Sequence, residues 1–198
     1  MRSVLLCLSA LLILAPASGA QAQSAQTEPA PAEPATIAAP PSLDKLLADL
    51  KREPKEHAAK RIADRISERW RHSGSESVDL LMLWAADATK AKKFGVALDF
   101  LDRVTVLQPD FSEGWNRRAT VHFMMKNYAL SMADIERALR LEPRHFGALS
   151  GMAQIFKDTG SKALALKAYE RVLEVYPMMR SAQNEVATLS EELAGQPI

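Results

Sequence analysis

The chain has 198 residues, with 25 Lys and Arg against 24 Asp and Glu, so it lacks the strongly basic balance of a nucleic-acid-binding domain. Hydrophobic residues make up 47% of the sequence, which excludes a chain that is disordered throughout, and a single cysteine excludes a disulfide framework. Ala and Leu are frequent while β-branched residues are sparse, which favours an all-helical fold.

Residues 1–22 have the pattern of a secretory signal peptide. Arg2 gives a short positive region, and the apolar run at residues 4–14 is short for a membrane span. Residues 20–22 read Ala-Gln-Ala, an A-x-A site that predicts cleavage after Ala22. An uncleaved membrane anchor is the weaker alternative, because polar residues follow the apolar run at once. In a bacterium we therefore expect a periplasmic protein with no stable membrane insertion after cleavage.

The mature chain left by this cleavage would contain no thiol and would begin with a linker. Cys7, the only cysteine, lies in the removed segment. A chain without thiols suits an oxidising compartment and cannot bind zinc through cysteine or use a thiol nucleophile. Residues 23–41 carry five prolines and almost no large apolar side chain. This composition predicts an extended or disordered linker, either a spacer or a passive leader.

Residues 42–77 predict a pair of helices at the N-terminus of the folded domain. Ser42 can cap a short helix, and Pro54 ends it. A charged amphipathic helix follows at residues 55–72 and closes at residues 73–75. We interpret the pair as N-terminal capping helices. Their apolar stripes are Leu43, Leu46, Leu47 and Leu50, then Ala59, Ile62, Ile66 and Trp70.

A sequence period of 34 residues begins at Val78 and runs through three repeats. Each repeat predicts two helices that meet through small residues, and a proline after the second helix sets the turn to the next repeat. One such hairpin cannot bury its own apolar face, so the repeats are expected to stack into a solenoid. The repeats are residues 78–111, 112–145 and 146–179, with prolines at 109, 143 and 177 and small residues at Ala85, Ala97, Ala119, Ser131, Ala153 and Ala165.

Residues 180–198 predict a C-terminal capping helix and a short tail. Ala182, Val186, Leu189 and Leu193 recur at helical spacing and form the inward face. The opposite face is polar between Gln183 and Glu192, as the end of a soluble solenoid requires.

In its period, small residues and prolines, the segment 78–179 resembles the tetratricopeptide repeat (TPR) family. The resemblance implies an all-α solenoid of three antiparallel helix hairpins with capping helices at both ends. One departure concerns the position that is usually alanine near the end of each repeat. It is Val104, Ala138 and Val172 here, and the change affects local packing only.

The sequence contains no motif for a catalytic nucleophile, a phosphate-binding loop or a metal site. Its histidines lie in four different elements and none is at helical ligand spacing from another, so each is interpreted as a surface or packing residue. His145, beside Arg144 in a turn between repeats, is expected to be solvated. We predict no catalytic residue, no metal, no cofactor and no enzymatic activity. The histidines are His57, His72, His122 and His145.

The resemblance implies that the first helix of each repeat lines a concave groove for a peptide, helix or protein partner. The lining is of mixed charge, so strong electrostatic steering is not expected. A clamp for a C-terminal carboxylate, found in some family members, is absent because Met82, Ala86, Arg117, Gly147 and Gly151 occupy its positions. The predicted partner-binding residues are Asn116, Arg117, Thr120, Phe123, Gly147, Ser150, Gly151, Gln154 and Lys157.

Gly147 and Gly151 lie on one face of the same predicted helix. Each costs about 1 kcal/mol relative to alanine in a helix interior, so a compensating use is expected. We hypothesise that a partner backbone or helix approaches closely there, beside Arg117 and Phe123. Packing between adjacent repeats explains the two glycines equally well.

These features predict a non-catalytic protein-protein interaction scaffold of the cell envelope, monomeric or weakly associating. The alternative is a structural solenoid that assembles through its terminal helices, or an accessory subunit of an envelope complex. The polar face of residues 183–192 argues against end-to-end assembly.

Overall fold

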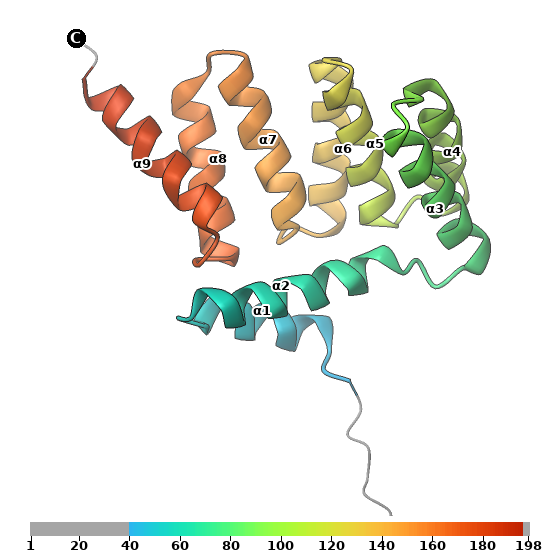
Figure 1. Cartoon of the computed structure of the whole chain (residues 1–198), viewed down its shortest axis with the longest axis horizontal. Coiled ribbons are helices and arrows are strands. Elements are labelled where there is room, and N and C mark those ends of the chain that lie inside the picture. The colour runs from blue at the N-terminus through green and yellow to red at the C-terminus, as the bar shows by residue number, and fades with distance from the viewer. Residues whose placement is uncertain (1–39, 196–198) are drawn as a thin grey trace, which may run out of the picture. The chain divides into compact units, whose positions relative to one another are not determined.

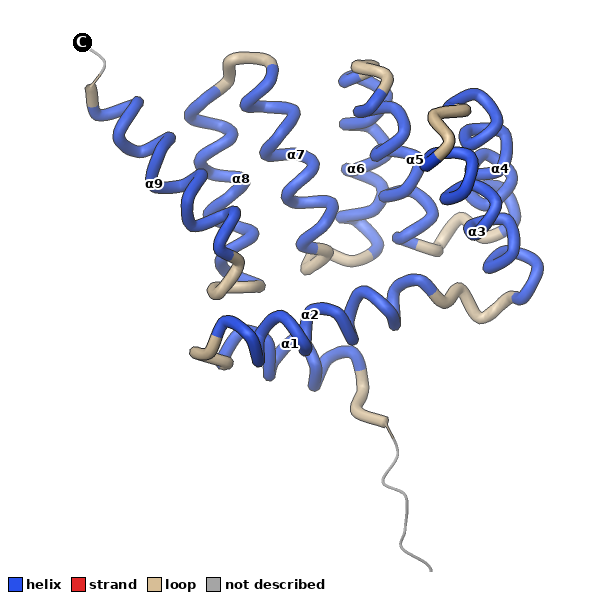
Figure 2. Tube along the Cα trace, viewed as in Figure 1, coloured by secondary structure: helices blue, strands red, loops and turns tan. Residues whose placement is uncertain are grey.

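The computed structural model describes residues 40–195, which belong to one compact unit, Pro40–Ile198. The predicted signal peptide and all but the end of the predicted linker lie outside the described residues. Residues 40–195 form nine helices and no strand, which confirms the predicted all-α fold, and none of these helices is long and apolar enough to cross a membrane. The helices are α1 (Leu43–Arg52), α2 (Glu56–Arg71), α3 (Glu76–Lys90), α4 (Phe94–Leu107), α5 (Ser112–Met124), α6 (Tyr128–Leu141), α7 (Phe146–Asp158), α8 (Lys162–Val175) and α9 (Arg180–Ala194) (Figures 1 and 2).

Helices α3 to α8 form three antiparallel hairpins that stack side by side, and α9 packs on the last of them (Figure 1). This arrangement confirms the predicted solenoid of helix hairpins. Pro109, Pro143 and Pro177 each lie two residues beyond the end of a second helix. They stand where the chain turns into the next hairpin, because proline cannot continue a helix.

Small residues let the two helices of each hairpin approach closely. In the middle hairpin the Ser131 hydroxyl donates a hydrogen bond of 2.8 Å to the Ala119 carbonyl, and both residues are buried. Larger side chains such as Ile135 fill the space beside this contact and are buried as well. The residues at the predicted small positions are all buried: Ala85, Ala97, Ala119, Ser131, Ala153 and Ala165.

In the tight turn inside each hairpin, one residue adopts the left-handed backbone conformation, with a positive φ. Lys92, Lys126 and Gly160 occupy equivalent positions and have φ values of 58°, 60° and 77°. In the middle hairpin the next residue, Asn127, donates its N–H to the carbonyl of His122 at 2.9 Å, which closes the end of the first helix. Glycine adopts this conformation freely, whereas lysine does so at a cost.

The N-terminal hairpin α1–α2 does not continue the stack. Figure 1 shows it running across the lower ends of the other helices, and its main packing partners outside the hairpin are α8 and α5. The apolar stripe of α2 faces the turns between repeats, where the Trp70 ring stacks on His145 at 4.1 Å and lies 4.9 Å from Phe146. The hairpin therefore covers the ends of the repeats near the turns that join them.

Apolar burial holds this hairpin more firmly than its ion pairs do. Leu47 and Leu50 are buried in the same core cluster as Leu149 of the third repeat. The ion pairs from Arg144 to Asp44 at 2.8 Å and from Arg180 to Glu56 at 3.0 Å join exposed side chains. Exposed pairs of this kind contribute about 1 kcal/mol or less.

The turn lysines give a test of the repeat geometry. The variant Lys126→Gly should raise the stability by about 1 kcal/mol, because glycine removes the left-handed strain and Lys126 forms no ion pair within residues 40–195. The reciprocal variant Gly160→Lys should lower it by a similar amount. Thermal unfolding of the two variants beside the parent measures both shifts, and equal melting temperatures would contradict the strain.

Candidate partner-binding groove

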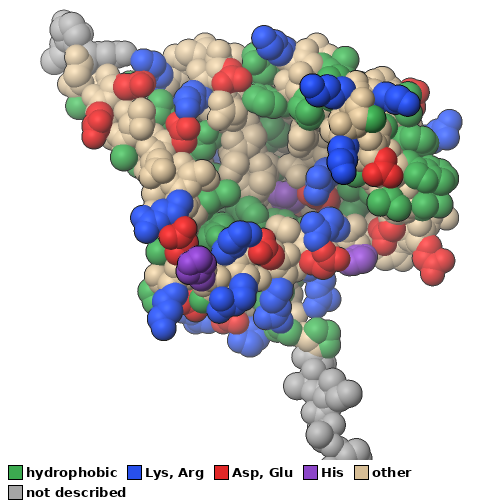
Figure 3. Space-filling model, viewed as in Figure 1, with side chains coloured by type: hydrophobic (Ala, Val, Ile, Leu, Met, Phe, Trp, Pro, Cys, Tyr) green, Lys and Arg blue, Asp and Glu red, His purple; other side chains and the backbone are tan. Residues whose placement is uncertain are grey.

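The first helices of the three repeats, α3, α5 and α7, form one face of the stack (Figure 1). Figure 3 shows that the middle of this face is hollowed and carries few charged side chains. Three depressions of about 130, 230 and 510 Å³ run from α7 across α5 to α3 and the end of α2. Thr120 lines the first two, and Met82, Ala86 and Arg117 line the last two. The depressions therefore form one continuous trough, which we call the groove.

Most of the predicted partner-binding residues meet in this groove. Arg117 lines its α3–α5 part, and its side chain is 45% exposed. Their role in binding stays a prediction, but the structure places them on one continuous surface. The residues that line the depression between α5 and α7 are Asn116, Thr120, Phe123, Gly147, Gly151 and Gln154.

Two predicted residues are engaged elsewhere. The Ser150 hydroxyl donates to the Phe146 carbonyl of its own helix at 2.8 Å. The Lys157 ammonium donates to both carboxylate oxygens of Glu185 on α9 at 2.7 Å. Lys157 thus joins α7 to α9 beyond the groove instead of lining it.

The two glycines have different surroundings. A Cβ atom at Gly147 would lie 3.3 Å from the His145 ring, which is itself packed against Trp70. At Gly151 it would lie 3.3 Å from the terminal methyl group of Ile135, which can rotate away. Packing therefore accounts for Gly147, because the neighbouring ring is buried and stacked. At Gly151 packing is a weaker restriction, because the neighbouring atom is the end of an aliphatic side chain. Ile135 is itself buried, but it contributes to the lining of the depression beside Gly151.

The sequence prediction missed several residues of the groove. Ser131 and Ile135 of α6 form part of its floor, although their positions in the repeat predicted packing alone. The missing side chain at Gly151 is the signal that could have found Ile135, because Ile135 is the residue that a Cβ atom there would contact. Arg71 and His72 line the far end of the groove. No local signal could have found these two, because they belong to the hairpin that crosses the stack.

A buried carboxylate organises the polar side of the groove. Glu113 is only 4% exposed. Its carboxylate accepts hydrogen bonds from Asn116 at 2.7 Å and from Arg117 at 2.6 Å, the two polar residues that face the groove next to it. The carboxylate thereby fixes the orientation of both side chains.

His145 completes this network from below. Its Nδ1 atom accepts the Ala148 backbone N–H at 3.2 Å, so Nε2 carries the proton and donates to Glu113 at 3.0 Å. The residue is 2% exposed, so our expectation of a solvated turn is wrong. The reason is tertiary, since Trp70 of the crossing hairpin covers this turn.

These contacts also set the pKa of Glu113. Burial by itself raises the pKa of a carboxyl group, but the hydrogen bond from His145 and the charge of Arg117 outweigh burial, so the pKa of Glu113 lies below its ordinary value of 4.5. The carboxylate is therefore ionised at neutral pH and acts as an acceptor.

A second support lies under Gln154, on the opposite wall. Its amide oxygen accepts the Tyr169 hydroxyl at 3.1 Å, and its amide nitrogen donates to Asp158 at 2.7 Å. Burial, together with the nearby charges of Glu185 and Asp158, raises the pKa of Tyr169 to about 12. The phenol therefore stays protonated and keeps Gln154 in one orientation.

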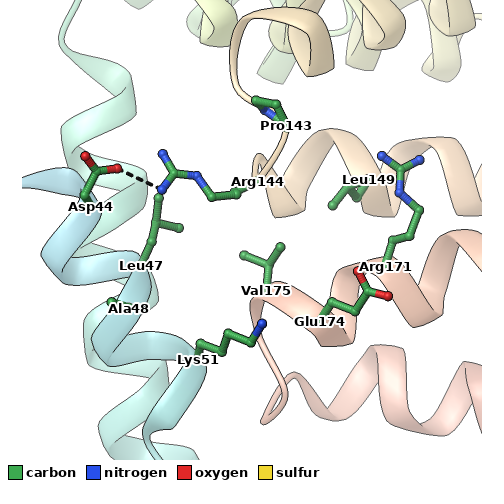
Figure 4. Close-up of a pocket in the computed structure, with 10 residues that line it drawn as sticks. All are labelled: Asp44, Leu47, Ala48, Lys51, Pro143, Arg144, Leu149, Arg171, Glu174 and Val175. Atoms are coloured by element: carbon green, nitrogen blue, oxygen red, sulfur yellow. Dashed lines mark hydrogen bonds and ion pairs between the residues drawn. The ribbon is translucent and has the colours of Figure 1, made fainter.

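A separate cleft of about 410 Å³ follows the line along which α1 meets the repeats (Figure 4). Arg144 reaches across one end of it to Asp44, as the dashed line in Figure 4 marks. Its remaining charged side chains, Lys51, Arg171 and Glu174, include both signs. No group of three or more potential metal ligands comes together within residues 40–195.

Comparison with known proteins finds relatives both by sequence and by structure. A sequence model of the tetratricopeptide repeat matches residues 112–145 and 147–177. A TPR repeat-containing protein of Rhizobium etli is 52% identical over 153 residues, which cover 77% of this chain and 75% of the relative. The first TPR of Spaghetti (RPAP3), solved bound to the HSP90 peptide SRMEEVD, is 26% identical with a TM-score of 0.58, over 61% of this chain and 96% of that one. A crystal structure of MamA is 16% identical, with a TM-score of 0.56 over 70% of this chain and 79% of that one.

The Glu113 network predicts a defined pH dependence. Because the folded-state pKa of Glu113 is lowered, its contribution to stability is complete above the unfolded value near 4.5 and is lost as the pH falls through the folded value. The variant Glu113→Gln should lose about 1–3 kcal/mol at pH 7. Urea unfolding should show this deficit shrinking below about pH 4.5. The exposed control Glu136→Gln should change little, and a deficit that is independent of pH would contradict the assignment.

Proposed function

The chain belongs to the tetratricopeptide repeat family, and from this premise we propose that it is a non-catalytic interaction scaffold of the cell envelope, which holds a peptide or helix in its groove. The observation that carries the proposal is the continuous groove over α3, α5 and α7, which seven of the nine predicted partner-binding residues line. A structural relative with 26% identity holds a peptide, which supports a peptide-sized occupant.

The shape of the groove favours a segment whose backbone comes close to its floor. Gly151 and Ile135 form a low apolar floor between the Phe123 wall and the α7 side. Contacts with a partner backbone or small side chains fit such a surface, and apolar burial there supplies about 25 cal/mol per Å².

Recognition of polar groups would rest on side chains that are already oriented. Asn116 and Arg117 are held by Glu113, and Gln154 is held by Tyr169 and Asp158. Such groups lose little conformational freedom when a partner binds, which favours affinity. Amide groups pair with the peptide backbone and guanidinium groups with carboxylates, so a peptide that presents backbone groups and an acidic side chain to these residues is a suitable occupant.

A substitution in the floor tests the groove. With a photo-crosslinking residue at Thr120, a partner should be captured by the parent chain, and Gly151→Leu should abolish that capture because the new side chain fills the floor. The helical circular dichroism should survive, since leucine is the better helix former.

Two controls keep this experiment specific. Gly95→Leu makes the same change at an exposed helical glycine with open space around it and outside the groove, and it should leave capture unchanged. A crosslinking residue at Arg140, exposed on α6, should capture little. Capture that persists in Gly151→Leu would reject the groove as the binding site.

The envelope location has a separate test. The sequence pattern at residues 1–22 supports export with cleavage after Ala22. Mass spectrometry of the protein purified from a bacterial periplasm should show an N-terminus at Gln23. Replacement of both Ala20 and Ala22 by Asp should accumulate the uncleaved chain. A chain that stays in the cytoplasm uncleaved would reject this part of the proposal.

A further inference from the structure

Large apolar side chains are exposed together on α3 and α4, at the first end of the stack. Figure 3 shows hydrophobic side chains gathered over these two helices. Trp84 of α3 is 45% exposed, and its ring lies 5.6 Å from that of Phe100 on α4. Clustered exposure of this kind is uncommon on a monomeric protein and marks a contact surface. The exposed apolar residues of this surface, which we call the α3–α4 face, are Leu80, Leu83, Trp84, Val96, Val106 and Leu107.

The equivalent positions in the second repeat show which kind of contact this face can make. In the next repeat, Gly114 and Arg118 stand 34 residues after Leu80 and Trp84. A Cβ atom at Gly114 would lie 2.7 Å from Val104 of the preceding hairpin, and Arg118 pairs with Asp102 of that hairpin at 2.8 Å. These positions are therefore the ones through which a repeat packs on the repeat before it.

The first repeat has the same packing positions, but no preceding hairpin of residues 40–195 packs against them. Trp84 and Phe100 stand where the second repeat has Arg118 and Asp134, an ion pair of 2.6 Å. The hairpin α1–α2, which precedes this repeat in sequence, crosses the stack elsewhere (Figure 1). The first end of the stack is therefore aromatic and uncovered within the described part of the chain.

The other end of the stack is different. Helix α9 exposes polar side chains, among them Asn184, Glu191 and Glu192. Solenoids need polar outer faces at both ends to remain soluble as monomers, and only this end meets that requirement. A head-to-tail contact would press a polar face against an apolar one, so the α3–α4 face does not suit α9 of another copy.

The charges on the α3–α4 face favour an identical partner. Asp87 and Lys93 line a hollow of about 560 Å³ beside Trp84, and Asp99 and Arg103 are exposed on α4. None of these four charged residues forms an ion pair with residues 40–195, and their charges sum to zero. A two-fold interface requires a surface on which each charge can meet its opposite, and this surface satisfies that condition.

We propose that the α3–α4 face is a self-association surface, through which two copies of this chain pack head to head about a two-fold axis. The Trp84 and Phe100 rings of one copy cover those of the other, and Asp87 faces Lys93 across the axis. Two helices of about 14 residues offer a footprint about 21 Å long and about 20 Å wide, which is at the small end of specific interfaces, where association is weak. We therefore expect a dissociation constant of about a micromolar or above. The polar α9 end closes the assembly at two copies.

Sedimentation velocity across the micromolar range tests the proposal. The compact unit Pro40–Ile198 and the exported chain should both convert from monomer to dimer as the concentration rises. A unit that stays monomeric throughout would overturn the proposal. Dimerisation of the unit without dimerisation of the exported chain would overturn it too, because the N-terminal residues would then cover the face.

A double substitution that introduces the residue types of the second repeat tests the α3–α4 face. W84R/F100D places the Arg118–Asp134 combination on the first repeat, so folding should be retained and the dissociation constant should rise at least about tenfold. Leu107→Glu, at a side chain that is 62% exposed, should weaken the dimer without affecting the fold. If both variants fold and still dimerise as the parent does, the assignment is rejected.

A charge swap tests the two-fold arrangement. Asp87→Lys and Lys93→Asp should each weaken the dimer about tenfold, because each places like charges opposite each other. The combined variant D87K/K93D should dimerise as the parent does, since the pairing is restored with reversed sign. A combined variant that is weaker than either single variant would exclude the proposed two-fold axis.

Discussion

The stacking of Trp70 on His145 is the contact on which the functional surfaces depend. Together with the buried Leu47 and Leu50 of α1, it holds the hairpin α1–α2 across the ends of the repeats and away from the outer side of α3 and α4. The same contact buries His145, whose Nε2 atom then donates to Glu113. One aromatic pair thereby sets the polar side of the groove and leaves the first end of the stack uncovered.

The groove combines an apolar floor with polar edges whose side chains are held by hydrogen bonds. At its floor, Gly151 has no side chain, and the apolar end of the buried Ile135 lies directly beneath it. At its edges, Glu113 and Tyr169 hold their neighbours through hydrogen bonds that are buried or partly buried. An interface built in this way gains affinity from apolar burial and selectivity from groups that cannot reorient cheaply.

Helix α3 contributes to both proposed surfaces through different faces. Met82 and Ala86 line the groove, whereas Trp84 and Asp87 belong to the face at the end of the stack. The two surfaces meet at Leu83, which lines the far end of the groove and also belongs to the α3–α4 face. Occupation of the α3–α4 face therefore leaves the depression between α5 and α7 free. A dimer would carry two grooves, and a partner with two binding segments would be held more strongly than by one groove.

The sequence by itself determined the helical repeats and most of the groove lining. The positions of Pro109 and Ala119 in the period follow from local rules, because helix ends and close helix contacts each demand particular residue types. Only the tertiary structure decided where α1–α2 docks, that His145 is buried and that Ile135 reaches the groove. These depend on contacts between segments far apart in the chain, and no local period records which apolar stripe meets which surface.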